Sequence, residues 1–232
     1  MREIEFVPKS QEAEALVPRP RAARSYTPEW FKKTPAFENN EMVIDENGKA
    51  NSTEKLCMPF SDTFSFGYIQ ETWCDIHIKL EGGRLSYSSS SSILPILHAR
   101  GGEEDHYSGN GFYGVEFAWY TQWAPKVPKG YSVLYTHPLN RFDLPFYSFS
   151  GVVESDKYFH EAAGNHPFLI KENFSGIIPA GTPMFQMIPF KREDWNSKAS
   201  AFDKLSPIKA MYVNKNFYGT YRKEFWKKKT YK

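Results

Sequence analysis

Hydrophobic and polar positions alternate along much of the middle of the chain, and turn-forming residues separate the alternating runs. In 68–80, for example, Ile76 and Ile78 share one parity and His77 lies on the other. A period of two residues is typical of strands that bury one face. Similar short runs follow each other over 127–190, where Pro, Gly and Asn interrupt them repeatedly. This pattern predicts a mainly β fold.

Several of these runs predict individual strands. We expect strands at 112–123, 130–135, 168–170 and 184–190, and a strand pair or bend at 146–153. The first is dense in aromatic residues and is expected to be buried, because aromatic side chains suit pleated surfaces. Gly151 and Gly181 are expected to form turns. The residues expected to line the wall of the fold are Val152, Val153, Met187 and Ile188.

The N-terminal end of the chain follows a different pattern. Residues 1–25 contain several prolines, and each proline biases its predecessor to an extended conformation, so an extended arm is expected. Residues 27–33 predict a short helix that has Thr27 as its N-cap and Pro28 in its first turn. An Asp-Glu-Asn-Gly sequence at 45–48 predicts a hairpin turn.

The C-terminal end loses the turn signals and gains Lys, Ala and Leu. Helices are expected at 207–216 and 218–229. The pattern as a whole therefore divides the chain into three parts. These are an arm with a short helix and a hairpin over 1–54, a β-clip or jelly-roll-like barrel over 55–192, and a basic, aromatic helical tail over 193–232.

Composition supports a β domain and narrows the range of partners. Of the 232 residues, 41% are hydrophobic and 17% are aromatic, which is enough for a core and favours strands. The net charge is only +2, so the chain has no global attraction to nucleic acid. The basic end at 221–232 has residues that contact phosphates and bases in other proteins. We expect it to pack Phe225 and Trp226 onto the body instead, and we expect no nucleic-acid partner.

The sequence also bears on location. The first residues lack the apolar run of a signal peptide, and no apolar segment approaches the roughly 18 residues of a membrane span. Cys57 and Cys74 form no C-x-x-C pair and are expected to be reduced, buried thiols. The expected location is the cytoplasm, which for a viral protein is that of the host cell, or the virion. No membrane partner is expected.

The six histidines do not form a metal-binding pattern. No H-x-x-x-H or H-x-H sequence occurs, and the nearest pair is His160 and His166. A metal centre needs converging ligands held by further hydrogen bonds, so we expect no metal and no cofactor. His137, which precedes a proline, is expected to be a hydrogen-bonding loop residue. A cupin-like metal-dependent barrel stays a second alternative, and its ligands would come from His137, His160 and His166.

Other catalytic patterns are weak. Acidic residues beside a histidine can bind a divalent ion, but we expect a solvated loop tip for Glu103, Glu104, Asp105 and His106. The chain has no G-x-S-x-G elbow, no Walker-type loop and no G-x-G-x-x-G sequence. These absences argue against standard hydrolases, kinases and dehydrogenases.

Residues 125–190 resemble the back half of the β-clip in the dUTPase and dCTP-deaminase superfamily. The shared order is a Pro-x-Gly-Tyr strand, then Gly-Val-Val followed by an acid, and then a closing strand that contains Gln. In that family an Asp activates water and a Tyr packs on the nucleoside. Here Glu154 stands for the catalytic Asp, Asp156 matches a second Asp and Tyr158 arrives one residue late. Gln186 matches the closing strand.

The same resemblance has departures that concern catalysis. The family's Pro-Arg-Ser phosphate motif would fall near 137–140 and is absent, and so is its Gly-rich C-terminal phosphate loop. The catalytic residues are therefore unknown, with Glu154 and Asp156 as the candidates. The candidate ligand-binding residues are Tyr158, His137, Asn140, Arg141 and Gln186.

A second resemblance covers nearly the whole chain. The motifs Thr-Pro-Glu-Trp-Phe at 27–31, Pro-Lys-Gly-Tyr-Ser-Val-Leu-Tyr-Thr-His-Pro-Leu-Asn-Arg at 128–141 and Pro-Ala-Gly-Thr-Pro-Met-Phe-Gln at 179–186 are similar to an uncharacterised family. That family occurs in tailed bacteriophages, notably marine T4-like ones, and in bacteria. The resemblance implies a phage or bacterial origin and brings no catalytic residues.

From these observations we expect a non-enzymatic phage-type β protein that acts by binding, in virion assembly or host takeover. By analogy with β-clip folds it is expected to be a homo-oligomer, for which a trimer is one form, with other phage or host proteins as further partners. The alternative is a dUTPase-like enzyme that binds or hydrolyses nucleotides. It would use Glu154 or Asp156 as base and Tyr158 as a stacking platform.

Overall fold

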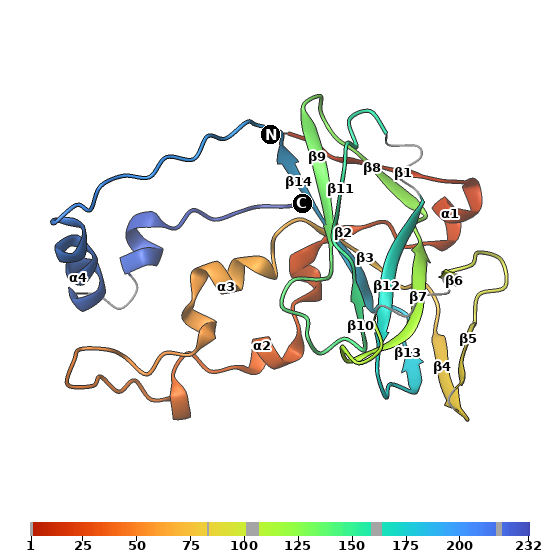
Figure 1. The fold of residues 1–232 in the computed structure, drawn as a ribbon, viewed down its shortest axis with the longest axis horizontal. Coiled ribbons are helices and arrows are strands. Elements are labelled where there is room, and N and C mark those ends of the chain that lie inside the picture. The colour runs from red at the N-terminus through yellow and green to blue at the C-terminus, as the bar shows by residue number, and fades with distance from the viewer. Residues whose placement is uncertain (1, 83, 101–106, 159–163, 217–219) are drawn as a thin grey trace. The chain divides into compact units, whose positions relative to one another are not determined.

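The mainly β prediction is confirmed. The computed structural model describes residues 2–82, 84–100, 107–158, 164–216 and 220–232 (Figure 1). The chain forms two compact units. The first consists of Met1–Ala23 and Gly67–Arg192, and the second of Arg24–Phe66 and Glu193–Lys232. The described strands of the first unit carry the β structure.

The described strands form four antiparallel sheets. The largest contains, in spatial order, β11 (Gly151–Val153), β9 (Tyr131–Thr136), β14 (Pro183–Lys191), β3 (Tyr68–Glu71) and β2 (Arg21–Ala22). The next contains β10 (Phe146–Ser148), β12 (Asn165–Lys171), β7 (Phe112–Tyr120) and β6 (Leu97–Arg100). The two smaller sheets are β13 (Gly176–Ile178), β4 (Ile76–Glu81) and β5 (Arg84–Ser89), and β1 (Glu5–Pro8) with β8 (Trp123–Lys126). Each sheet ends in edge strands, so among the described strands the sheets are open and none closes into a barrel.

The two large sheets share one aromatic core. Trp119 of β7 stacks on Phe168 of β12 with ring centroids 3.7 Å apart and planes 6° apart. The Trp119 indole N–H is buried and donates to Ser148 Oγ at 3.1 Å. Ser148 Oγ donates in turn to the carbonyl of Met184 in β14, at 2.6 Å. A buried indole N–H needs such a partner, and this chain of bonds joins the two sheets.

Turn and strand positions mostly follow local sequence. The strand expected at 112–123 is β7, which is buried only at Phe117, Ala118 and Trp119. It ends at Tyr120, because β8 begins at Trp123 and pairs with β1 instead. Gly181 does form a turn, with a φ of 86°. The expectation for Gly151 is wrong, because this residue lies within β11 and pairs with Tyr135 of β9.

The expected N-terminal arm is extended except for one helical turn. Between β1 and β2 the chain forms α1 (Gln11–Leu16). Ser10 caps this helix, since its hydroxyl accepts from the Ala13 N–H at 3.1 Å. The short helix therefore arises from a capping residue that follows Pro8.

The remaining helices lie in the second unit, except that the first of them begins at Ala23, the last residue of a first-unit segment. These are α2 (Glu29–Lys33), α3 (Met58–Thr63), α4 (Ser206–Asn216), short 3₁₀ turns at Ala23–Tyr26, Glu38–Asn40 and Glu54–Leu56, and a π turn at Tyr221–Phe225. Helix α2 confirms the short helix expected at 27–33, but Thr27 is not its cap. The Thr27 hydroxyl donates to the Arg24 carbonyl, and Pro28 occupies the cap position.

Aromatic side chains hold the second unit together. Trp30 and Phe31 of α2 pack on Phe60 and Phe64 around α3, and the closest ring centroids, of Phe31 and Phe64, lie 4.5 Å apart. The carboxylate of Asp62 accepts from the indole N–H of a tail residue, Trp226, at 2.9 Å. The chain end is thus fixed to α3. In the described residues, no helix has the length and apolar content to cross a membrane.

Candidate functional site

The loop between β9 and β10, residues 137–145, gathers several of the candidate ligand-binding residues. His137 begins this loop. The Ser148 N–H donates to His137 Nδ1 at 3.3 Å, so Nδ1 is an acceptor and the proton lies on Nε2. Nε2 then donates to the Arg141 carbonyl at 3.0 Å. Burial lowers the pKa of His137 below its ordinary value. A neutral imidazole therefore closes the loop, as expected for a hydrogen-bonding loop residue.

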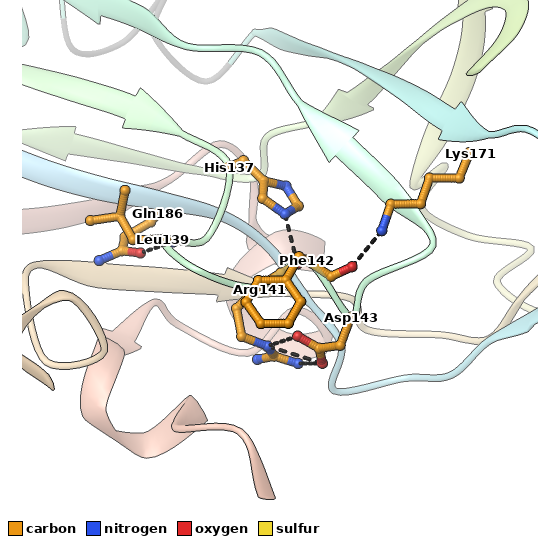
Figure 2. Close-up of polar contacts among 7 residues, drawn as sticks. All are labelled: His137, Leu139, Arg141, Phe142, Asp143, Lys171 and Gln186. Atoms are coloured by element: carbon orange, nitrogen blue, oxygen red, sulfur yellow. Dashed lines mark hydrogen bonds and ion pairs between the residues drawn. The ribbon is translucent and has the colours of Figure 1, made fainter. Parts of the chain in front are cut away.

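A hydrogen bond to the side chain of Gln186 in β14 fixes the middle of the loop. The side-chain oxygen of Gln186 accepts from the Leu139 N–H at 2.8 Å, and Gln186 is almost fully buried (Figure 2). Asn140 follows with a φ of 58°, a left-handed conformation that Asn tolerates better than most residues. These contacts fix the direction in which the rest of the loop leaves the sheet.

The tip of the loop carries a charged pair and an exposed ring. The Arg141 guanidinium donates two hydrogen bonds to the Asp143 carboxylate (Figure 2). Nε donates to Oδ1 at 2.8 Å, and a terminal nitrogen donates to Oδ2 at 2.9 Å. Lys171 of β12 donates to the Phe142 carbonyl at 2.5 Å. The Phe142 side chain is 67% exposed. Since Arg141 and Asp143 bind each other, the tip offers an apolar ring rather than an uncompensated charge.

This loop forms one wall of a groove with a volume of about 720 Å³. The other walls are the turn after β12, strand β13 and the turn that leads into β14. The lining residues are Arg141, Asp143, Leu144, Pro145, Lys171, Glu172, Asn173, Phe174, Ile177, Ile178, Pro179, Ala180, Gly181, Thr182 and Pro183. The volume lies in the range of ligand sites, about 300–1,000 Å³, and most of the lining side chains are apolar.

The acidic candidates lie elsewhere, in the turn after β11. The Asp156 carboxylate is 1% exposed and binds the Arg192 guanidinium, with contacts of 2.5 and 3.0 Å. It also accepts from the Gly130 N–H at 2.8 Å. The bond to Arg192 is the main cause that lowers the pKa of Asp156 to about 2. A carboxylate this acidic and this occupied is a weak proton acceptor.

The other two residues of that turn face outward. The Glu154 carbonyl accepts from the Lys157 and Tyr158 N–H groups at 2.9 and 3.0 Å, which shapes the turn. The Glu154 side chain is exposed, and Tyr158 is 52% exposed. The turn thus presents Glu154 and Tyr158 to solvent while it buries Asp156.

The seven candidate residues therefore form two groups rather than one site. His137, Asn140, Arg141 and Gln186 lie at one end of the paired strands β9 and β14. Asp156 lies at the other end, beside Gly130 and Arg192. Arg192 lies six positions after Gln186 along nearly extended chain, which corresponds to about 20 Å. Of the seven candidates, Arg141 of the first group is the one that lines the groove.

Of the three histidines that the metal-dependent alternative would use, the structure describes His137 and His166. His166 lies in the core against Tyr135 and Phe185, and burial lowers its pKa to about 4. His137 serves the loop described above. His160 lies outside the described residues, as do Glu103, Glu104, Asp105 and His106. Among the residues that are described, no three His, Cys, Asp or Glu side chains gather as a metal site would require.

The groove itself was missed by the sequence reasoning, which named only Arg141 of its lining. The sequence Arg-Phe-Asp at 141–143 is a usable signal, because an exposed Phe between two opposite charges suits a loop tip. Strand β13 and the turn after it contain no sequence motif that predicts a binding site. No protein-family model matches the chain, and no curated protein matches it in sequence.

Proposed function

We propose that this chain is a non-enzymatic phage-type β protein that acts by binding, and that the groove beside β13 is its binding surface. The observation that carries the proposal is the groove of about 720 Å³, whose lining is largely apolar. The resemblance to proteins of tailed phages motivates a role in virion assembly or host takeover, in the host cytoplasm or the virion.

The state of the ionisable groups supports binding over catalysis. A general base needs a pKa near the working pH and a free position for the proton it takes. Asp156 has a pKa of about 2 and is held by Arg192. Both ring nitrogens of His137 are engaged by the backbone. Arg141 and Asp143 form a mutual ion pair at the groove wall.

The backbone of β13 indicates what the groove binds. Strand β13 is an edge strand that pairs only with β4 among the described strands. The Ser90 N–H donates to the Asp75 carbonyl at 3.0 Å, so odd-numbered residues of the β4 chain face β5 and even-numbered ones face β13. Gly176 and Ile178 pair with those even-numbered residues. The N–H and C=O of Ile177 therefore point away from β4.

An extended peptide is the ligand that suits such an edge. A strand edge offers alternating donors and acceptors, which a second extended chain satisfies while its side chains enter adjacent pockets. Ile177 is 52% exposed and lies in the groove lining. We therefore assign the groove to an extended segment of another protein.

Two screens test this assignment against its rival. Deoxynucleoside triphosphates with magnesium should give neither turnover nor a thermal shift, whereas turnover that Asp156→Asn abolishes would establish the dUTPase-like enzyme instead. A displayed random-peptide library, selected on the intact chain, should enrich sequences with alternating apolar residues. Absence of enrichment, or enrichment that survives Ile177→Asp unchanged, would contradict peptide binding in the groove.

A further inference from the structure

The loop 137–145, which forms one wall of the groove, is attached to β10 through a nitrogen atom of His137. His137 Nδ1 accepts from the Ser148 N–H at 3.3 Å. Directly after β10, the Phe149 N–H donates to the Pro167 carbonyl of β12 at 2.9 Å. Because inter-strand bonds alternate along an antiparallel pair, the N–H of the preceding residue, Ser148, points away from β12. His137 therefore supplies the acceptor for a donor at the edge of this sheet.

Ser148 is held too firmly to move with the histidine. It is fully buried, its hydroxyl accepts from the Trp119 indole at 3.1 Å, and the same hydroxyl donates to the Met184 carbonyl at 2.6 Å. These bonds fix Ser148 between the two large sheets. A change at Nδ1 therefore displaces the ring of His137 and the loop that it begins.

Protonation makes the contact between Nδ1 and Ser148 repulsive. A histidinium ring is a donor at both nitrogens, so its Nδ1–H would face the Ser148 N–H. The bond from Nε2–H to the Arg141 carbonyl, 3.0 Å long, is retained and strengthened by the charge (Figure 2). The ring and the Arg141 backbone therefore leave β10 together. Arg141, Asp143 and Leu144 line the groove, so its wall moves with them.

The surroundings of His137 favour the neutral ring. Burial is the largest cause that lowers its pKa below the ordinary value, and the bond to the Arg141 carbonyl opposes it. Lys171 of β12 and the Arg141 guanidinium lower the pKa further, whereas Asp143 raises it. From β10, the Tyr147 ring stacks on the imidazole with centroids 5.0 Å apart. The closed loop therefore belongs to neutral pH, and acid opposes it.

We propose that His137 is a pH switch for the groove: protonation of its ring releases the loop 137–145 from β10, and the groove then loses the extended segment that it binds. This inference rests on the proposed function, because it concerns the ligand of the same groove. The segment is bound at neutral pH and is released below pH 6.5, the ordinary pKa of a histidine. All of the groups involved belong to the first unit.

Hydrogen exchange tests the release of the loop without any ligand. NMR of the full chain can follow the ring nitrogens of His137 and the amide of Ser148 through one titration. Protection of the Ser148 amide, corrected for the intrinsic exchange rate at each pH, should fall by about tenfold or more in step with protonation of His137. The Phe149 amide is the internal control. It donates into the sheet and should stay protected until the whole fold is lost.

Two matched substitutions separate His137 from the other titrating groups. In His137→Asn the side-chain oxygen can accept from the Ser148 N–H as Nδ1 does, and the amide takes up no proton. Protection of Ser148 in this variant should not follow the titration. His77→Asn makes the same change at an exposed histidine of β4, in another sheet, so its Ser148 response should be that of the unmodified chain. Circular dichroism at each pH checks that both variants fold.

A binding measurement connects the loop to the groove. A selected peptide that is blocked at both ends and lacks His, Asp and Glu contributes no titration of its own. Its affinity for the unmodified chain should fall by about tenfold or more at the pH that releases Ser148. Its affinity for His137→Asn, whatever the value at neutral pH, should not change over the same range.

Three results would overturn the inference. The first is a Ser148 amide that stays protected after His137 is protonated. The second is a pH response in His137→Asn equal to that of the unmodified chain. The third is a peptide affinity that does not change when the loop is released, which would leave the proposed function intact. A chain that binds no peptide at neutral pH contradicts the proposed function instead, and the exchange measurement still decides whether the loop is released.

Discussion

His166 lies in the core between Tyr135 and Phe185, with ring centroids 5.5 and 4.9 Å away. Its Nε2 atom and the Tyr135 hydroxyl are buried without a hydrogen-bond partner among the described residues. Burial lowers the pKa of His166 to about 4, and it raises the pKa of Tyr135 above its ordinary value. A histidine that is neutral because it is buried among apolar groups makes the stability of the fold depend on pH.

The pH dependence of stability should show this histidine. In the unfolded chain His166 titrates near 6.5, and in the folded chain near 4, so the unfolded state binds the extra proton between these values. Stability is therefore full above about pH 6.5 and falls as the pH drops towards 4, by about 3 kcal/mol in total. His166→Phe should flatten this part of a urea-unfolding pH profile.

Exposed His77 supplies the control for that measurement. His77 lies on β4 and is exposed, so His77→Phe controls for the chemistry of a change from histidine to phenylalanine. If His166→Phe kept the full slope, the buried neutral histidine would not be its cause.

The buried ion pair predicts a second loss of stability at lower pH. The pKa of Asp156 is lowered from 3.8 to about 2, so its contribution is present above about pH 4 and lost as the pH falls towards 2. Asp156→Asn should lower Tm at pH 7 and remove this acid limb. Glu5 pairs with Lys126 in solvent, and Glu5→Gln should change stability by only about 0–1 kcal/mol. Equal effects of the two changes would contradict a structural role for the Asp156 pair.

The sequence alone does not reveal the ion-pair partner of Asp156. The motif Gly-Val-Val-acid-x-Asp singles it out as a candidate base. Its partner Arg192 lies 36 residues further along, and no local pattern joins them. The register of β9 and β14 sets Tyr131 opposite Lys191 and so brings Arg192 beside the turn. The expectation that His137 is a hydrogen-bonding loop residue is confirmed, because its partners Arg141 and Ser148 lie nearby in the sequence.

At the scale of elements, Gly67 lets the chain just before β3 approach the backbone of strand β14. A Cβ atom at Gly67 would lie 2.3 Å from the Met187 carbonyl oxygen, and its φ is 78°. Gly111 has a similar φ of 83° with nothing within 4 Å of its would-be Cβ. The two glycines share backbone conformation and differ in the space around them.

This pair of glycines gives a clean comparison of stability. Gly111→Ala should cost about 1–2 kcal/mol, the price of a left-handed backbone for a residue with a Cβ. Gly67→Ala should cost more, because the carbonyl of a central strand must also shift. Urea unfolding of both variants measures the difference. A Gly67→Ala protein no less stable than Gly111→Ala would show that β14 can move away freely.

Strands and helices that a local sequence pattern specifies were predictable from the sequence. The strands expected at 130–135 and 184–190 correspond to β9 and β14 within a residue or two. The strand pair or bend expected at 146–153 is confirmed as β10 and β11, but no local signal shows that the two strands pair in different sheets. Helix α1 was missed because Pro8 before it and Pro18 and Pro20 after it favour extended chain.

At the scale of the whole molecule, sheet order decides which residues meet. Strand β14 pairs with both β9 and β3, although β3 precedes it by more than a hundred residues. That order separates the two groups of candidate residues and builds the groove from segments that share no motif. Long-range pairing of this kind depends on the packing of all strands together, which a single sequence does not reveal.

The affinity of a selected peptide for two single-site variants tests the central claim, that the chain acts by binding at the groove. Ile177 and Val152 are 52% and 54% exposed, each in a three-residue edge strand, and only Ile177 lines the groove. Fluorescence polarisation should show Ile177→Asp binding about tenfold or more weakly, a loss of about 1.4 kcal/mol or more. Val152→Asp should bind like the unmodified chain. Unchanged affinity for Ile177→Asp, or an equal loss in Val152→Asp, would contradict the account.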